Sequence, residues 1–198
     1  MSVKRDLELL YEIGCLRFIP RAWKQFFNPD FQNLAEHHLR VVWIALMLAK
    51  YEGRVNTEKI MKMALAHDLP ESRTGDVHYI SRMYTKRNEA LAIKDIVKDT
   101  SLENEMINLW EEYEERKSLE AKIVKDADTL DVDLEVQEQE MKGHGHSIVW
   151  KRERKKFVPG KLYTASAKKL WKAVITSRPY DWHTHARNRV NNGDWKTK

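Results

Sequence analysis

Four side chains capable of acid–base chemistry or metal binding lie close together in MALAHDLPESRTGDV, the stretch that spans residues 63–77. They are His67, Asp68, Glu71 and Asp76, and they follow a run of apolar residues. Two interpretations fit this pattern. The four groups are either solvated loop residues after a helix, or ligands and proton-transfer groups at a metal centre.

The position of His67 favours the metal centre. His67 follows Ile60 by seven residues and Met63 by four, so on a helix it points along the buried stripe. Asp68 comes next, at a helix C-terminus, where the helix dipole disfavours negative charge. A divalent cation would stabilise that carboxylate and would also bind a neutral imidazole nitrogen.

A second histidine is expected to face the core. His37 shares the 3–4 spacing of Val41 and Ile44 on a strongly periodic helix, whereas His38 falls on the neighbouring stripe and is assigned to packing or to support of the site. A later acidic helix offers further carboxylates. Periodicity makes Asp131 the most inward of them, with Asp126 and Asp128 on its flanks, and does not decide between them.

The elements that must position these residues are all helical. Helices are predicted over residues 4–13, 33–53, 57–67, 85–99, 104–143 (with a break near Ser118) and 164–177. The first has Leu7, Leu10 and Tyr11 on one side, and residues 14–32 are mostly loop. Since no alternating strand pattern is present, the predicted fold class is all-α, as a single domain over residues 1–198.

The composition is that of a globular protein: 198 residues, with 42% hydrophobic and 33% charged side chains. The single cysteine, Cys15, excludes an intramolecular disulfide, and no apolar run has membrane-spanning length. With no signal peptide either, we expect a cytoplasmic protein without a membrane partner.

The net charge of +5 is concentrated in the last third, in WKRERKKFVPGK and in HARNRVNNGDWKTK. This basic, helical extension over about 150–198 favours either a phosphate-rich polymer or no specific partner. Acidic and basic residues alternate over most of the chain, so we do not expect nucleic-acid binding.

Taken in order, these motifs resemble the HD-domain metal-dependent phosphohydrolases. The resemblance is close to one branch, the 5′-deoxynucleotidases of the bacterial YfbR type and their eukaryotic relatives. It covers about residues 19–141 and rests on three motifs: AEH ending at His37, the run from His67 to Asp76 that contains HD, Glu71 and TGD, and Lys125 followed three residues later by Asp128.

The resemblance implies a compact helical bundle around one divalent metal ion. Its ligands would be His37, His67, Asp68 and Asp128, so that Asp128 takes the role that periodicity left open among the acidic residues. The metal is one of Co, Mn, Fe, Zn or Mg. The resemblance also implies a homodimer.

The remaining roles follow from the same resemblance. Glu71 is similar to the catalytic acid/base, and Asp76 to the residue that orients water or holds the sugar hydroxyl. Arg21 is similar to the phosphate-binding arginine, and Trp23 to the tryptophan beside the sugar. This chain departs from the YfbR pattern there, because Ala22 separates Arg21 from Trp23.

The expected reaction is removal of phosphate from (deoxy)nucleoside 5′-monophosphates. Nucleoside triphosphate hydrolysis is the alternative within the family, since the basic residues at 151, 152 and 154–156 could meet additional phosphates. A nucleic-acid-binding module with a structural metal site is the alternative from another class. The GHGH segment at 143–146 is interpreted as a flexible loop.

Overall fold

The computed structural model describes residues 2–184, whose regular elements are all helices. Within them, the only β-type pairing is an isolated bridge between Pro20 and Asn33. The all-α prediction is therefore confirmed. The elements are α1 (Val3–Cys15), η1 (Leu16–Phe18), η2 (Ala22–Gln25), α2 (Leu34–Glu52), α3 (Thr57–Ala66), α4 (Glu71–Thr74), η3 (Ser81–Met83), α5 (Glu89–Val97), α6 (Glu103–Glu115), α7 (Leu119–Met141), α8 (His146–Lys161), α9 (Ala165–Val174) and α10 (Asp181–Thr184).

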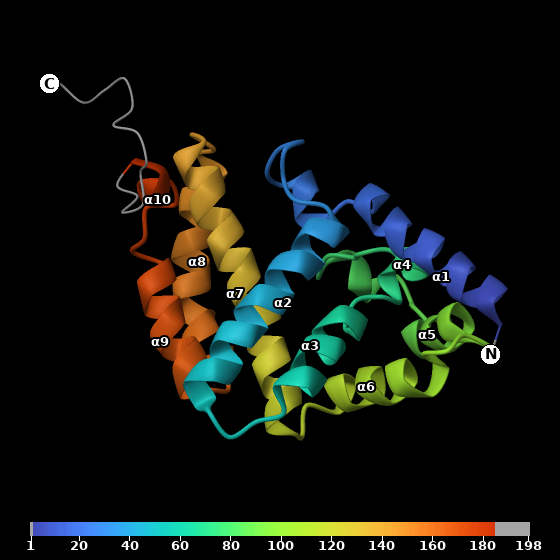
Figure 1. Cartoon of the computed structure of the whole chain (residues 1–198). Helices are drawn as coiled ribbons and strands as arrows, with labels where there is room; N and C mark the ends of the chain where they lie inside the picture. The colour runs from blue at the N-terminus through green and yellow to red at the C-terminus, as the bar shows by residue number, and fades with distance from the viewer. Residues whose placement is uncertain (1, 185–198) are drawn as a thin grey trace, which may run out of the picture.

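The central helix α2 is packed against α3 and α7 (Figure 1). A capping box starts it: the Asn33 side chain accepts from the Glu36 backbone N–H, and the Glu36 carboxylate accepts from the Asn33 backbone N–H. Gly53, with φ of 84°, ends it. The predicted inward residues are buried, so this helix is confirmed, and it carries His37 into the core.

The His-Asp pair lies in the turn between α3 and α4. Asn56 caps α3, which ends at Ala66, so His67 and Asp68 directly follow its last turn. The sequence places Glu71 in a loop, and this is wrong, because Glu71 begins the short helix α4. Pro70 precedes that helix with φ of −55°, a value already suited to helix entry, and Gly75 ends it with φ of 73°.

The predicted break near Ser118 is confirmed. Arg116 adopts a left-handed conformation after α6, and the Ser118 hydroxyl accepts from the Ala121 backbone N–H to start α7. The predicted helix over 85–99 is shorter in the structure. It begins at Glu89 because the Asn88 side chain caps it.

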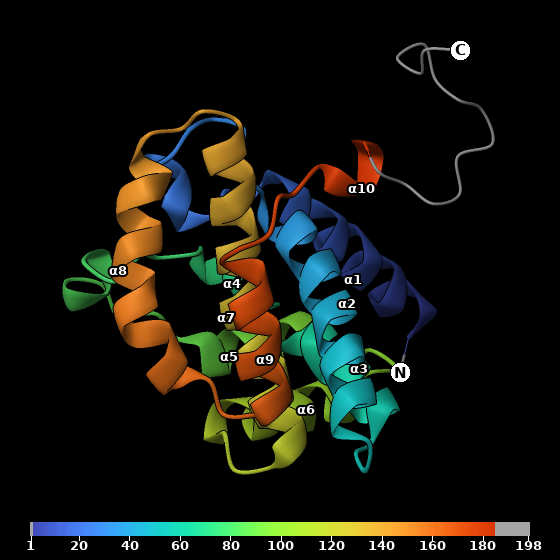
Figure 2. The ribbon, with the colours of Figure 1, turned by 90° about the vertical axis from the view of Figure 1, so that its left-hand side faces the viewer.

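Helices α8 and α9 pack on α7 at the end of the molecule opposite α1 (Figure 1, Figure 2). The helix predicted over 164–177 is present as α9, with Thr164 as its N-cap, and Asp126 accepts hydrogen bonds from the backbone N–H and the hydroxyl of Thr164. The loop expected at 143–146 is present, but it covers residues 142–145, because α8 already begins at His146. The predicted basic extension continues into residues 185–198, which lie outside the described residues.

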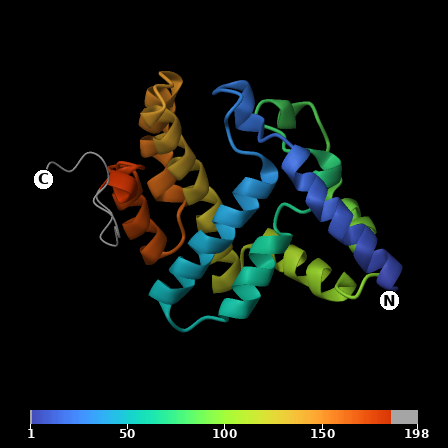
Figure 3. The ribbon, with the colours of Figure 1, turned by 45° about the horizontal axis from the view of Figure 1, so that its top comes forward.

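Helix α1 lies along the outside of the molecule, beside the α4 and α5 region (Figure 3). Glu12 accepts two hydrogen bonds from Arg73 of α4, at 2.7 and 2.8 Å. The buried residue of α1 is Leu9, whereas Leu7, Leu10 and Tyr11 are exposed. Across residues 2–184, no helix combines the length and the apolar character needed to span a membrane.

Candidate metal centre and active site

The four predicted ligands come together although three separate elements carry them. His37 projects from α2, His67 and Asp68 follow α3, and Asp128 projects from α7. One potential ligand atom from each of these residues lies within 4.8 Å of those of the other three. Two imidazoles and two carboxylates at this spacing could hold a metal ion.

Hydrogen bonds fix which nitrogen of each imidazole faces the centre. His67 Nδ1 donates to the carbonyl oxygen of Ala64 at 2.7 Å, because a carbonyl can only accept. His37 Nδ1 lies 2.6 Å from a carboxylate oxygen of Asp131 and donates to it. The two Nε2 atoms therefore face each other across 3.3 Å, which suits a shared cation.

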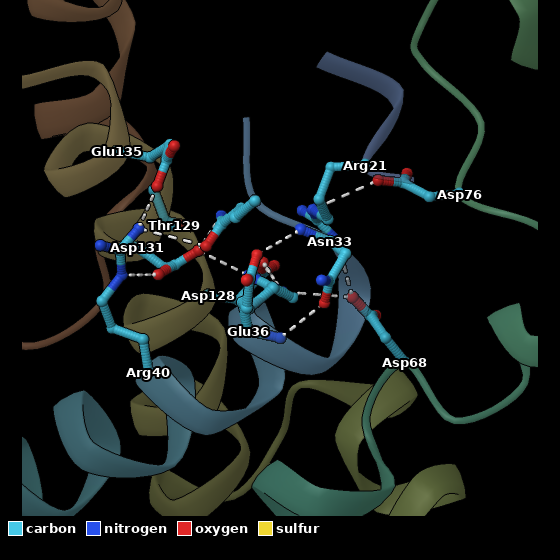
Figure 4. Close-up of polar contacts among 12 residues, drawn as sticks. Arg21, Asn33, Glu36, Arg40, Asp68, Asp76, Asp128, Thr129, Asp131 and Glu135 are labelled. Atoms are coloured by element: carbon cyan, nitrogen blue, oxygen red, sulfur yellow. Dashed lines mark hydrogen bonds and ion pairs between the residues drawn. The ribbon is translucent and has the colours of Figure 1, made fainter. Parts of the chain in front are cut away.

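Periodicity did not decide which carboxylate of the acidic helix joins the cluster, and the structure places Asp131 outside it. It is the most inward carboxylate, with 0% exposure, but it lies on the far side of His37 from the centre. Arg40 also donates to it (Figure 4), and so does Gln32. Although burial opposes its charge, His37 and Arg40 lower the pKa of Asp131 to about 2, so it is an anionic acceptor. The sequence did not identify this role or that of Arg40.

The two carboxylates of the cluster are also held ionised. Lys125 donates to Asp128 at 2.7 Å. Burial opposes the charge of Asp128, but Lys125 and His37 hold its pKa well below the usual range. For Asp68, burial is likewise outweighed, by His67 and His37. Both groups are therefore available as anionic ligands.

Arg21 and Asp76 lie together beside this cluster (Figure 4). Arg21 is 6% exposed, and its guanidinium lies 3.4 Å from Asp68 and 3.3 Å from Asp76. Asp76 also accepts from the backbone N–H of Ala22 at 3.0 Å, which ties the two segments together. The turn at Gly75, with its positive φ, directs Asp76 back toward Arg21.

Glu71 completes this side of the site. It is 4% exposed, and Arg87 donates to one of its oxygens at 2.9 Å while also donating to the Gly75 carbonyl. Burial, reinforced by Asp68 and Asp76, raises the pKa of Glu71 to about 9. The sequence did not single out Arg87, because an arginine in a loop has no periodic signal.

Trp23 lies against α8, the helix that carries the basic run. The Trp23 ring contacts the Trp150 ring edge-on, with centroids 4.6 Å apart. Arg154 is buried and donates twice to Asp133, Lys151 donates to Glu140, and Arg152 and Lys156 pair with Glu153. Four of the five basic residues are thus paired with carboxylates, and Arg152 and Lys156 share one of them.

The other histidines of the described chain make different contacts. His78 bonds to the Ser81 hydroxyl at 2.9 Å, and His144 bonds to the Phe27 carbonyl at 2.6 Å. The His–carboxylate group that could hold a metal between residues 2 and 184 remains the one around His67.

A helical bundle that joins one His, a His-Asp pair and a distal Asp from three elements defines a protein of the HD class. The chain belongs to the HD-domain family, whose model matches residues 13–171, including α8 and most of α9. It is an HD-domain phosphohydrolase related to 5′-deoxynucleotidases, which confirms the resemblance seen in the motifs.

The relatives support this placement. The chain is 34% identical over 142 residues to the 5′-deoxynucleotidase HDDC2 of Danio rerio, covering 68% of this chain and 69% of the relative. It is 34% identical over 150 residues to that of Dictyostelium discoideum, covering 70% and 79%. A solved structure of a conserved hypothetical protein from Pyrococcus furiosus is 28% identical, with a TM-score of 0.71, covering 85% of this chain and 98% of that one.

Proposed function

We propose that this protein is a metal-dependent phosphomonoesterase that removes the 5′-phosphate from (deoxy)nucleoside monophosphates. The observation that carries the proposal is the convergence of a His₂Asp₂ cluster, a buried arginine and a buried glutamate whose pKa is raised. The names of the relatives indicate the nucleotide substrate.

One divalent metal ion would be held by His37, His67, Asp68 and Asp128. When bound, such an ion neutralises charge on the phosphoryl oxygens and makes water more acidic. The donor set suits Co, Mn, Fe, Zn or Mg.

The chain's own residues would supply the remaining chemistry. The planar guanidinium of Arg21 matches two phosphoryl oxygens, and Asp68 and Asp76 hold it in place. Glu71 is buried beside Arg21, and it can serve as the acid that protonates the leaving 5′-oxygen. Asp76 lies beside Arg21, where it can contact water or the sugar hydroxyl.

Triphosphate hydrolysis stays the alternative within the family. It would need cations for the additional phosphates, and the pairing of Lys151, Arg152, Arg154 and Lys156 with carboxylates argues against them in that role. The same pairing disfavours a nucleic-acid-binding module.

The test is a panel of ribo- and deoxynucleoside mono- and triphosphates with several divalent metals, with phosphate, pyrophosphate and triphosphate products separated. We expect phosphate release from monophosphates. Asp68→Ala should lose both metal and activity, whereas Glu71→Ala should keep the metal and lose activity by about 100- to 10,000-fold. Exposed Asp95→Ala is the matched control. Full activity in Asp68→Ala or Glu71→Ala would overturn the assignment.

We further propose a homodimer. An exposed apolar stripe on α2, made of Leu39, Trp43, Met47 and Tyr51 at four-residue spacing, offers a surface of the kind that oligomers bury.

A further inference from the structure

A cavity of about 620 Å³ lies between α8 and two segments that adjoin the candidate active site. Four aromatic side chains line it, and a carboxylate and an ammonium group lie among the other lining residues. The aromatic residues are Trp23, Tyr79, Trp150 and Phe157, and the charged ones are Glu153 and Lys161. The volume is in the range of small-molecule sites in proteins, roughly 300–1,000 Å³.

The cavity is joined to the site through the backbone. Trp23 follows Arg21 by two residues, and Tyr79 follows Asp76 by three. A chain spans at most about 3.6 Å per residue, so these walls begin within roughly 7 and 11 Å of the two site residues. Figure 2 shows both segments beside α8. The walls of the cavity and two residues of the candidate active site therefore belong to the same two short segments.

The lining suits a flat, uncharged ring system. Trp150 contacts the rings of both Trp23 and Tyr79, with centroids 4.6 and 6.3 Å apart. Tyr79 is nevertheless 56% exposed and Phe157 39% exposed, so ring surface remains open to a ligand. The indole N–H of Trp150 is itself buried and has no acceptor within the described chain, so Trp150 offers the cavity its ring surface rather than a hydrogen bond.

The charged residues of the cavity do not suit additional phosphates. Glu153 pairs with Arg152 and Lys156, and the Lys161 ammonium lies 5.0 Å from the centre of the Phe157 ring. Arg154, which also lines the cavity, is committed to Asp133.

We infer that this aromatic cavity binds the nucleobase of the substrate, an inference that rests on the proposed nucleotidase function. Ring faces bind every base by stacking, so the cavity would accept purines and pyrimidines alike. The part of the molecule that α8 adds would thus serve substrate affinity, while the metal centre serves the chemistry.

The experiment compares a deoxynucleoside 5′-monophosphate with deoxyribose 5-phosphate, which lacks the base, in the full-length, metal-loaded protein. We expect Tyr79→Ala and Trp150→Ala to lower kcat/KM for the nucleotide by about 5- to 150-fold, mainly through KM, since stacking on one aromatic ring carries an effect of that size. The value for the sugar phosphate should stay nearly unchanged. Trp150→Phe should restore most of the loss.

The matched controls are Tyr84→Ala, in the same loop but 83% exposed, and Trp182→Ala, 71% exposed on α10. Equal losses for both substrates, or equal wild-type efficiency on both, would overturn the base site. If neither substrate releases phosphate, the proposed function fails. Binding of a nucleoside, measured by calorimetry, then tests by itself whether the cavity holds a nucleobase. Binding that Tyr79→Ala weakens supports the cavity, and no binding overturns it.

Discussion

One buried carboxylate, Asp131, contacts the candidate metal centre without belonging to its cluster of potential ligands. Asp131 accepts from His37 Nδ1, which leaves Nε2 to face the cluster, and Arg40 and Gln32 hold Asp131 in place. Such a carboxylate fixes the orientation of the imidazole and increases its basicity.

Asp131→Asn should therefore weaken metal binding by about 10- to 100-fold, because the amide can still accept from His37 but carries no charge. Titration of the metal-free protein with Co²⁺, followed by absorbance, measures this affinity. Glu138→Gln removes another carboxylate from Arg40 without touching His37, so it should leave the affinity nearly unchanged. Unaltered affinity in Asp131→Asn would contradict the role.

Glu71 makes the stability of the metal-free protein depend on pH. Its pKa rises from 4.5 to about 9 through burial and the neighbouring Asp68 and Asp76. Folding therefore retains a proton that the unfolded chain loses, and stability falls as pH increases from about 4.5 to 9. The cost is on the order of a few kcal/mol at the upper end.

Glu71→Gln should remove this dependence, since the amide has no charge and still accepts from Arg87. In metal-free protein we expect a higher Tm than the wild type at pH 8, with the difference vanishing near pH 4. Thermal unfolding across this pH range measures it. A wild-type Tm equal to that of Glu71→Gln at pH 8 would show that Glu71 is not buried as described.

At the scale of elements, the sequence predicted what hydrophobic periodicity can encode. α2 and α7 have regular apolar stripes, and their core faces and inward His37 and Asp131 are as expected. The starts of α2 and α9 could be predicted because Asn33 and Thr164 have short polar side chains that satisfy free backbone N–H groups.

The segment of α8 was assigned to the basic helical extension, but no separate helix was predicted for it, because only part of its inward face is apolar. Its inward residues include Ser147 and Arg154, and Arg154 is held by Asp133, which also accepts from the indole of Trp171. A helix whose inward residues are partly polar or charged shows no regular apolar stripe in the sequence. The aromatic cavity was not predicted for the same reason, since Trp150 and Phe157 lie on α8. The sequence analysis therefore assigned Trp23 to the sugar alone.

At the scale of the whole molecule, the exposed stripe on α2 bears on assembly. If Leu39, Trp43, Met47 and Tyr51 form a dimer interface, Trp43→Glu should convert the protein from twice its 23.5 kDa chain mass to a monomer. Light scattering after size exclusion measures the mass. Tyr84→Glu, an exposed aromatic elsewhere, is the control. A dimer that survives Trp43→Glu would exclude this stripe as the interface.

The short turn from Arg21 to Gln25 has a consequence for the length of the substrate. Arg21 and Trp23 are fixed relative to each other by this turn, and the Ala22 N–H is anchored to Asp76. If one holds the phosphate and the other the base, their separation is set by rigid backbone. A 5′-monophosphate can bridge the two residues, whereas attack on the terminal phosphate of a triphosphate would draw the base away from Trp23. The protein would thus distinguish mono- from triphosphates by distance rather than by charge, which the substrate panel measures directly.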